Sequence, residues 1–446
     1  MKFEIKKKEL EIIPLLFIAI FYTMTRAWCA AKFGSIAYIA FLGIICIFII
    51  GYIVTYGKQC VKIRKNTFWI CYTLYLTCIV LNLLCHTSAS AYALIEYVLY
   101  MLFLFAMCYI MSNIAFEKIL QIYEIIGIIV SIEAIWEFIS GRILFRTNLE
   151  SQVIRRAYGL IGSPLTLGMI LACIILISIY RGMISNRKHY IVSVLAVIGL
   201  FCTQSRGPLV GAAVGFAVMM LVHNLSEENN AGSSLGTGVL KAVIMLFLLY
   251  QVIKWLSNYV EIANSIYQRI QTIMIWDSTE SANYQRMEKW RDAWQLFKGN
   301  PIFGIGVSST GSRAATGIVL ESGVLKKLVE MGIIGFVLYY YMMISTAVKN
   351  IIIAMKNHSK YCALAVGVMC AIFVENFIMQ IVESAGVFMI FMWFFTYLIF
   401  TNRGGVWIEL IQENIKEYIS NHKINMEKID LYSILGVMEV DGLCLY

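Results

Sequence analysis

Long apolar runs follow one another along almost the whole chain, separated by short polar connections. Most runs are roughly 18 to 25 residues long, the length that a helix needs to cross the ~30 Å hydrocarbon core of a bilayer. The pattern therefore predicts an all-α, polytopic integral membrane protein with about twelve spans. The predicted spans are Ile12–Ala30, Ile36–Tyr56, Phe68–Cys85, Ala91–Ile114, Ile119–Ile139, Pro164–Tyr180, Tyr190–Cys202, Pro208–Val222, Val239–Leu256, Val324–Val348, Tyr361–Met379 and Ala385–Phe400.

The composition fits a chain that lies mainly in lipid. Of 446 residues, 60% are hydrophobic and only 14% are charged, which is about half the charged share of a soluble domain. The net charge of +9 could indicate nucleic acid, but Lys and Arg lie in short clusters between apolar runs. Membrane topology explains such clusters, so no nucleic-acid partner is expected.

The basic clusters orient the spans, because short cytoplasmic loops carry an excess of Lys and Arg. The loops after the second, sixth and tenth spans are basic, with Lys58, Lys62, Arg64, Lys65, Arg181, Arg187, Lys188, Lys349, Lys356 and Lys360. The loops at 86–90 and 380–384 contain neither residue type. Both termini are therefore predicted to be cytoplasmic. The seventh and eighth spans are short enough to form a re-entrant hairpin, which would leave this orientation unchanged.

The same orientation divides the chain into two parts. Residues 1–402 form the predicted membrane domain, with one large extracytoplasmic loop between the ninth and tenth spans. Residues 403–446 form a cytoplasmic tail, whose first part, Val406–Ile419, has the spacing of an amphipathic helix that lies along a membrane surface. The basic N-terminus and the first apolar run resemble a signal peptide but lack a convincing cleavage site, so we expect an uncleaved span.

Three predicted outer segments, 140–163, 203–207 and 257–322, carry arginine against this charge rule. Their arginines are Arg142, Arg146, Arg155, Arg156, Arg206, Arg269, Arg286, Arg291 and Arg313. The positive-inside rule does not explain arginines on the outer side. Binding of an anionic ligand there would explain them. The alternative is that these side chains extend to anionic lipid headgroups.

Local sequence signals strengthen the ligand interpretation. Ser163 followed by Pro164 predicts a helix start, and Pro208 predicts a second, so helix N-termini that attract anions should face outward beside Arg156 and Arg206. Residues 281–298 contain neither Gly nor Pro and precede Gly299-Asn300-Pro301, which predicts a helix in the long outer segment. On this helix Arg286, Trp290 and Trp294 share one stripe, suited to a phosphate and a sugar or to packing at the membrane interface.

The sequence shows no motif of metal-binding or redox residues. The 12 cysteines are spread singly and mostly inside apolar runs, and the 5 histidines form no cluster. We therefore predict neither a metal site nor a cofactor.

Several short motifs together resemble the family of O-antigen ligases and Wzy-type polysaccharide polymerases. They are Arg156 with Gly159, Gly162 and Pro164; Thr203-Gln204-Ser205-Arg206-Gly207; Arg286 with Trp290 ahead of Asn300-Pro301-Ile302-Phe303-Gly304-Ile305-Gly306; and Glu321-Ser322 ahead of Leu325, Leu328, Glu330, Gly332 and Gly335. The resemblance covers roughly residues 155–335 by motif. It implies a GT-C-like helical membrane glycosyltransferase in the bacterial cytoplasmic membrane.

The resemblance implies that a glycan is transferred from undecaprenyl pyrophosphate on the outer face of that membrane, by inversion and without a metal. Arg156, Arg206 and Arg286 would bind the pyrophosphate, with Arg155 and Arg291 as alternates, and Trp290 and Trp294 are candidates for sugar contact. Preplaced arginines and helix N-termini would stabilise the growing charge on the leaving group.

Glu321 is the predicted proton acceptor for the attacking hydroxyl, or else it caps the following helix. The ligase branch of the family typically has a histidine at this position, so Glu321 favours polymerisation, in which donor and acceptor are both lipid-linked repeats of O-antigen, capsule or exopolysaccharide. Glu96, Glu133, Glu137 and Glu375 could line the acceptor groove or form buried ion pairs, and we place none of them in the catalytic set.

Transfer to another acceptor, as by a ligase, is one alternative function. A transporter or flippase for lipid-linked oligosaccharide is the second, because twelve spans are also typical of transporters. Membrane lipids, a flippase and a chain-length regulator are the further partners that the resemblance implies.

Overall fold

The computed structural model describes residues 13–14, 16–18, 43–52, 54, 67–90, 92–111, 114–143, 156–227, 282–311, 317–381 and 384–401, with isolated positions between 251 and 271. The predicted first and ninth spans and the predicted tail lie wholly or mainly outside these ranges. So do Arg146, Arg155, Arg269 and Arg313.

The described part of the chain is helical, and no strand occurs in it. Its main helices are α3 (Thr67–Cys85), α4 (Tyr92–Met111), α5 (Phe116–Ser140), α6 (Pro164–Ile184), α7 (His189–Thr203), α8 (Arg206–Glu227), α11 (Ala282–Gly299), α12 (Gly323–Lys356), α13 (Cys362–Ile378) and α14 (Ala385–Thr401). Within the described ranges, 5 helices are long and apolar enough to cross a membrane, namely α4, α5, α6, α8 and α12. Shorter apolar helices, including Gly43–Tyr52, accompany them. The predicted all-α, multi-pass membrane fold is confirmed.

Two predicted boundaries need correction. The eighth span begins at Arg206 rather than Pro208, so that the proline lies inside the first turn, where its missing N–H costs no helical hydrogen bond. The tenth span is longer than predicted, with 34 residues, and Gly332 interrupts its helical geometry.

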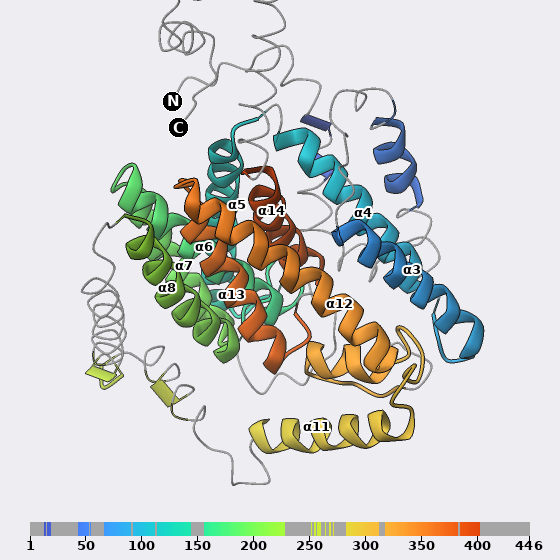
Figure 1. The fold of residues 1–446 in the computed structure, drawn as a ribbon. Coiled ribbons are helices and arrows are strands. Elements are labelled where there is room, and N and C mark those ends of the chain that lie inside the picture. The colour runs from blue at the N-terminus through green and yellow to red at the C-terminus, as the bar shows by residue number, and fades with distance from the viewer. Residues whose placement is uncertain are drawn as a thin grey trace, which may run out of the picture.

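Helix α6 lies at the centre of the bundle, in contact with α5, α7, α8, α13 and α14 (Figure 1). Almost every residue between Leu167 and Gly182 is buried. Helices α8 and α13 approach each other most closely, because Gly215 and Gly367 face each other and a Cβ on either would overlap the carbonyl oxygen of the other. Small residues permit such close packing between helices in lipid.

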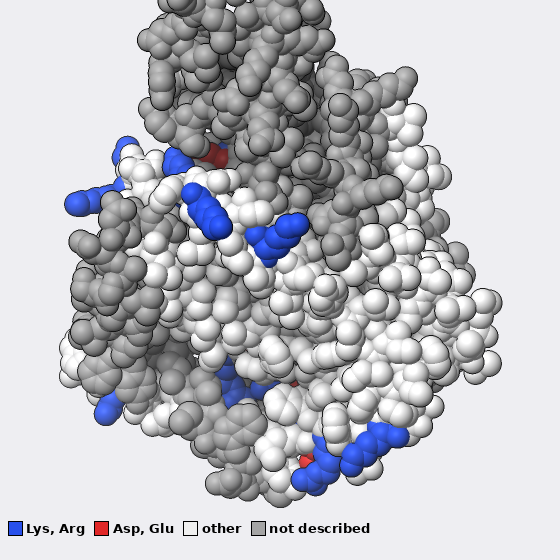
Figure 2. Space-filling model, viewed as in Figure 1, with Lys and Arg blue, Asp and Glu red and all other residues white. Residues whose placement is uncertain are grey.

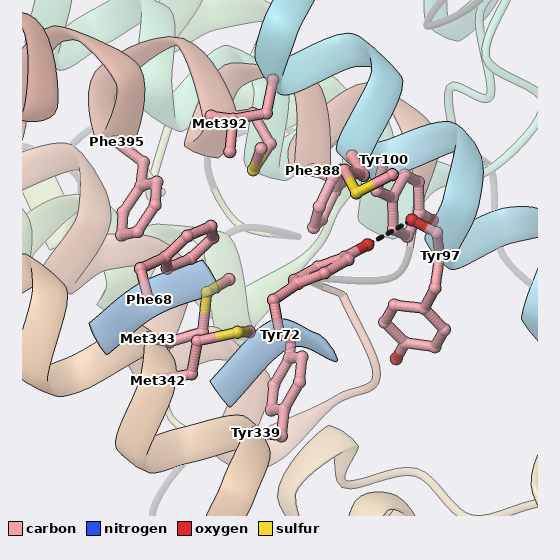
Figure 3. A pocket seen from close by; sticks show the side chains of 12 residues that line it. Phe68, Tyr72, Tyr97, Tyr100, Tyr339, Met342, Met343, Phe388, Met392 and Phe395 are labelled. Atoms are coloured by element: carbon pink, nitrogen blue, oxygen red, sulfur yellow. Dashed lines mark hydrogen bonds between the residues drawn. The ribbon is translucent and has the colours of Figure 1, made fainter. Parts of the chain in front are cut away.

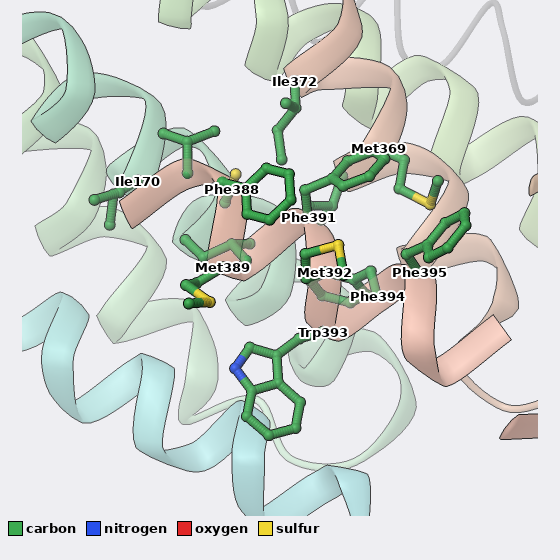
Figure 4. Packing of buried hydrophobic residues seen from close by; sticks show 14 of the residues in the cluster. Ile170, Met369, Ile372, Phe388, Met389, Phe391, Met392, Trp393, Phe394 and Phe395 are labelled. Carbon is green, nitrogen blue, oxygen red and sulfur yellow. The ribbon is translucent and has the colours of Figure 1, made fainter. Parts of the chain in front are cut away.

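Helix α14 supplies the aromatic part of the core. Figure 4 shows its side chains packed with Ile170 of α6 and with Met369 and Ile372 of α13. The rings of Phe391 and Phe395 are stacked, with centroids 5.9 Å apart. Trp393 is among the largest fully buried side chains.

Charged side chains gather toward the two ends of the bundle, and the face between them is mostly uncharged (Figure 2). Large apolar side chains such as Ile47, Leu84 and Ile191 are more than two-thirds exposed, with 72%, 79% and 71% accessible. A belt of exposed apolar side chains between polar ends is typical of a surface that faces lipid.

The two ends of the bundle have different chemistry. At one end, which we call the Arg181 end, the guanidinium of Arg181 pairs with Glu124 of α5, and Nδ1 of His189 lies 2.9 Å from Glu124 Oε1. At the other end, which we call the α11 end, α11 lies across the ends of the bundle helices (Figure 1). The predicted arginine-bearing segments belong to this second end.

Candidate glycosyl-transfer site

The described parts of the three arginine-bearing segments meet at the α11 end. The backbone N–H of Ala157 donates to the carbonyl of Cys202 at 3.0 Å, which joins the first segment to the second. The Ser205 hydroxyl donates to the carbonyl of Pro164 at 2.9 Å, which ties the turn between α7 and α8 to the start of α6. The first two segments, although distant in sequence, are therefore joined by buried hydrogen bonds.

Glu137, near the end of α5, fixes the loop before α6. Its Oε2 accepts hydrogen bonds from the backbone N–H groups of Tyr158 at 2.7 Å and Gly159 at 2.8 Å. Ser163 then caps α6 by accepting from the N–H of Thr166 at 3.5 Å, with Pro164 as the first helical residue. The predicted helix start is confirmed, and the loop has a defined path that presents Arg156.

Arg156 points to the turn between α7 and α8. Its Nε donates to the carbonyl of Thr203 at 3.2 Å, and its Nη2 donates to the hydroxyl of Ser205 at 3.3 Å. Arg206 follows as the first residue of α8 and is half-buried. The first turn of α8 adds backbone amides and the positive end of a helix dipole, so positive charge accumulates around this turn.

The helix predicted between 281 and 298 is present as α11, and it positions a second arginine. Arg286 donates from Nε to Oε2 of Glu321 at 2.9 Å. The other carboxylate oxygen of Glu321, Oε1, lies 2.5 Å from Nζ of Lys289. Both carboxylate oxygens of Glu321 are therefore engaged, and this residue joins α11 to the start of α12.

The remaining predicted side chains of α11 lie in different surroundings. Trp290 is half-buried, and its indole N–H is shielded from solvent without a hydrogen-bond partner among the described residues. Trp294 is 47% exposed, and its ring lies 5.2 Å from that of Phe297. Arg291 is exposed, and its side chain leaves the helix about 140° away from that of Arg286.

The loop after α11 is built into a break in α12. Gly332 has φ 63° and ψ −170°, a combination that is essentially restricted to glycine. The N–H of Ile305 donates to the carbonyl of Val329 at 2.9 Å, and the N–H of Ile333 donates to the carbonyl of Pro301 at 2.9 Å. The loop thus satisfies backbone groups that the break leaves without helical partners.

Asn82 of α3 fixes the same loop from the other side. Its Nδ2 donates to the carbonyl of Phe303 at 2.7 Å, and its Oδ1 accepts from the N–H of Val307 at 2.6 Å. These contacts give a structural role to the Asn300–Gly306 motif, because they fix the loop that follows α11.

A carboxylate that the sequence analysis left outside the catalytic set lies between the arginine segments. Glu375, in the last turn of α13, has 0% accessible surface. Its carboxylate lies against Gly207, because a Cβ on that glycine would overlap both carboxylate oxygens. Arg286 is close enough to act on Glu375 electrostatically. The sequence names it as an acidic residue within an apolar span that could line the acceptor groove or form a buried ion pair.

Two of the other acidic residues named from the sequence have ordinary partners. Glu137 accepts backbone hydrogen bonds, as described above, and Glu96 accepts from the hydroxyl of Tyr100 at 2.7 Å. Glu133 lies beside Gly159, with one carboxylate oxygen that has no hydrogen-bond partner among the described residues.

A small apolar cavity lies elsewhere, between α3, α4, α12 and α14 (Figure 3). Tyr72, Tyr97, Tyr339 and Phe388 are among its lining residues, and the Tyr72 hydroxyl donates to the carbonyl of Tyr97. Beside it, Nζ of Lys327 lies 4.8 Å from the ring centre of Tyr97 and 5.2 Å from that of Tyr339. With a volume of about 30 Å³, the cavity has room for little more than a water molecule, so it is not a glycan site.

Comparison with known proteins agrees with the geometry. Residues 191–340 match the family described as O-Antigen ligase. The matched region contains Arg206, Arg286 and Glu321, whereas Arg156 and Glu375 lie outside it. The chain matches no curated protein.

Members of the matched family are membrane glycan ligases and polymerases, with lipid-linked glycans as substrates. The resemblance found in the motifs is therefore confirmed. Residues 191–340 thus resemble the O-antigen ligase family, and the chain is a multi-pass membrane protein whose matched region supports a glycosyl-transfer enzyme in general.

Proposed function

We propose that the protein polymerises oligosaccharide repeats that are linked to undecaprenyl pyrophosphate, on the outer face of the bacterial cytoplasmic membrane. Both termini then lie in the cytoplasm, residues 1–402 form the membrane domain and residues 403–446 the tail. One repeat is the donor and another is the acceptor. The product is the polymer of an O-antigen, capsule or exopolysaccharide.

One observation carries the proposal: the segments with Arg156, Arg206 and Arg286 converge at one end of the bundle. Arg156 contacts the turn that precedes Arg206, and Glu375 lies between the start of α8 and Arg286. Three guanidinium groups beside a helix N-terminus suit a pyrophosphate, because a planar guanidinium can bind two oxygens of a phosphate at once.

The positive charge of the three arginines suits glycosyl transfer with an anionic leaving group. The acceptor hydroxyl attacks the anomeric carbon, the bond to the pyrophosphate oxygen breaks, and undecaprenyl pyrophosphate leaves with the electron pair. Arg156, Arg206 and Arg286 stabilise the charge that grows on this leaving group. Arg155 and Arg291 are peripheral candidates for the same ligand, and Trp290 and Trp294 are candidates for sugar contact.

Glu321 has two candidate roles in this reaction. It is the proton acceptor that the sequence predicts, and its ion pairs with Arg286 and Lys289 support a second task, the orientation of Arg286. The variant Glu321→Gln separates the two roles, because the amide cannot take a proton from the hydroxyl but can still accept a hydrogen bond from Arg286.

Ligation is the second candidate function, since the matched family is described as O-Antigen ligase. The glutamate at position 321, where ligases typically have histidine, favours polymerisation. A transporter of lipid-linked oligosaccharide is the third candidate.

Reconstitution tests all three functions. The purified full-length protein is placed in vesicles with lipid-linked repeats isolated from the producing bacterium. Polymerisation gives a ladder of longer lipid-linked glycans. Transfer of a glycan only to an added non-repeat acceptor supports a ligase, and movement of intact repeats across the vesicle membrane supports a transporter. Absence of any new glycosidic bond contradicts the proposal.

A further inference from the structure

We propose that Glu375 is the group that takes the proton from the acceptor hydroxyl. This inference rests on the proposed glycosyl transfer and adds a residue outside the matched region of the family. Two carboxylates, Glu321 and Glu375, lie beside Arg286.

The two carboxylates differ in what their oxygens already bind. Each oxygen of Glu321 has a cationic partner, Arg286 at 2.9 Å and Lys289 at 2.5 Å. Neither oxygen of Glu375 has a hydrogen-bond partner among the described residues, although the side chain is fully buried. Buried polar groups almost always have partners, so an exception at a candidate site indicates a function. Each oxygen of Glu321 is thus already neutralised by a cation, whereas the oxygens of Glu375 have no partner among the described residues and can accept a proton.

The position of Glu375 also fits this role. It lies between the first turn of α8 and Arg286, where the leaving group would be bound. One helical turn later Met379 contacts the same arginine, with Sδ 3.8 Å from Nη2 of Arg286. The neighbouring Asn376 lies against Gly323 at the start of α12. The C-terminal end of α13 therefore contacts α8, α11 and the start of α12. These elements carry or adjoin Arg206, Arg286 and Glu321.

Gly207 packs directly against the Glu375 carboxylate. It is half-buried, and a side chain there would occupy the position of the Glu375 oxygens. For the acceptor hydroxyl to reach Glu375, the first turn of α8 must move aside. In the described structure the carboxylate is shielded from water.

The step balances in atoms and charge. The acceptor oxygen forms a bond to the anomeric carbon, and the bond from that carbon to the pyrophosphate oxygen breaks. The hydroxyl proton passes to the Glu375 carboxylate, which becomes a neutral acid. Undecaprenyl pyrophosphate leaves with the electron pair, and Glu375 later returns its proton to water.

The test compares Glu375→Gln with wild-type protein on two nucleophiles, using full-length protein and lipid-linked repeats from the producing bacterium. One nucleophile is the acceptor repeat, whose hydroxyl must lose a proton. The other is azide, which has no proton to lose and would give a glycosyl azide. Removal of a general base typically lowers the rate by about 10² to 10⁴-fold. We expect such a loss with the acceptor repeat, a near-normal rate with azide and unchanged donor affinity.

Two control variants, Glu288→Gln and Gly43→Ala, and one further test variant, Gly207→Ala, separate chemistry from folding. Glu288→Gln changes an exposed carboxylate of α11 and should have wild-type rates. Gly207→Ala displaces the carboxylate without removing it and should lower transfer to the acceptor repeat, whereas Gly43→Ala, at a helix position with open space around it, should not.

The outcomes are distinct. Wild-type transfer to the acceptor repeat by Glu375→Gln overturns the inference, and so does an equal loss with both nucleophiles or a loss of donor affinity alone. If the wild-type protein does not accept azide, the acceptor repeat alone is used. A lower kcat of Glu375→Gln at unchanged donor affinity then supports the inference, and a change confined to KM overturns it. A wild-type protein that forms no glycosidic bond contradicts the proposed function itself.

Discussion

Arg286 and Glu321 form an ion pair at 2.9 Å that joins α11 to the start of α12. The guanidinium is only 20% exposed, so its direction is set by this carboxylate and by the nearby Met379. An arginine held in a fixed direction before the substrate arrives binds phosphate with a smaller loss of side-chain entropy. The pair therefore links the helix outside the bundle to the site within it.

Glu321→Gln is expected to weaken donor binding by about tenfold, with a smaller effect on kcat. The amide keeps one acceptor for Arg286 but loses the charge that holds Arg286 and Lys289, and a tenfold change corresponds to about 1.4 kcal/mol. Titration of the purified protein with the lipid-linked donor measures the binding constant. The opposite result, unchanged affinity with a kcat at least 100-fold lower, would make Glu321 the proton acceptor instead of Glu375.

Arg286→Ala and Arg291→Ala should differ sharply, although both remove an arginine from α11. Arg286 is held toward the candidate site, whereas Arg291 is exposed on another side of the helix. Loss of one donor that stabilises a transition-state charge lowers kcat by about 10² to 10³-fold. We expect this loss for Arg286→Ala and a near-normal rate for Arg291→Ala in the vesicle assay. Equal losses would show that the pyrophosphate lies along the exposed side of α11.

Glu137→Ala is expected to lower both stability and transfer, because two buried backbone N–H groups lose their acceptor. An unsatisfied buried donor costs about 1–3 kcal/mol. The loop that presents Arg156 would also lose its fixed path. Glu137→Gln is the matched control, since its amide oxygen still accepts a hydrogen bond, and it should have the milder effect in thermal unfolding and in transfer. Identical behaviour of the two variants would contradict this explanation.

Much of the bundle could be predicted from the sequence because lipid imposes a simple rule on helix length and polarity. Nine predicted spans coincide with helices, from α3 to α8 and from α12 to α14. The helix α11 was also predictable, because its start and stop residues are local signals. The first span, the ninth span and the tail, which lie wholly or mainly outside the described ranges, stay predictions.

The site was less predictable because its contacts join distant segments. The hydrophobic pattern runs without interruption from Val324 to Val348, and the break at Gly332 exists because the loop at 301–306 supplies its hydrogen bonds. Glu375 appears in the sequence as one acidic residue in an apolar run, and only the packing of α13 against α8 places it behind Gly207.

Gly332→Ala is expected to destabilise the protein by about 2–3 kcal/mol, because a Cβ would strain the backbone at φ 63°. It would also overlap the carbonyl oxygen of Ile302 and push the loop out of the break in α12. Thermal unfolding of the detergent-solubilised protein measures this change. Gly299→Ala, at a position with open space around it, should keep the wild-type transition. A transition of Gly332→Ala equal to that of the control would mean that the break tolerates a side chain.

The buried charges at the Arg181 end should matter for folding and not for chemistry. Arg181 is 2% exposed and Glu124 is 7% exposed, and His189 lies beside the same carboxylate. Removal of one partner of a buried ion pair costs about 3–5 kcal/mol, whereas replacement of both by neutral groups of similar size can cost little. Arg181→Met should therefore sharply reduce the yield of monodisperse protein.

The double variant Arg181→Met with Glu124→Gln should recover most of that yield, because no uncompensated carboxylate remains next to His189. Molecules of either variant that do fold should transfer glycan at the wild-type rate, since the cluster lies at the opposite end of the bundle from Arg286. Size-exclusion chromatography and the vesicle assay, normalised to folded protein, measure the two effects separately. A double variant as poorly folded as the single one would show that the ion pair itself, and not the avoidance of a lone buried charge, holds α5, α6 and α7 together.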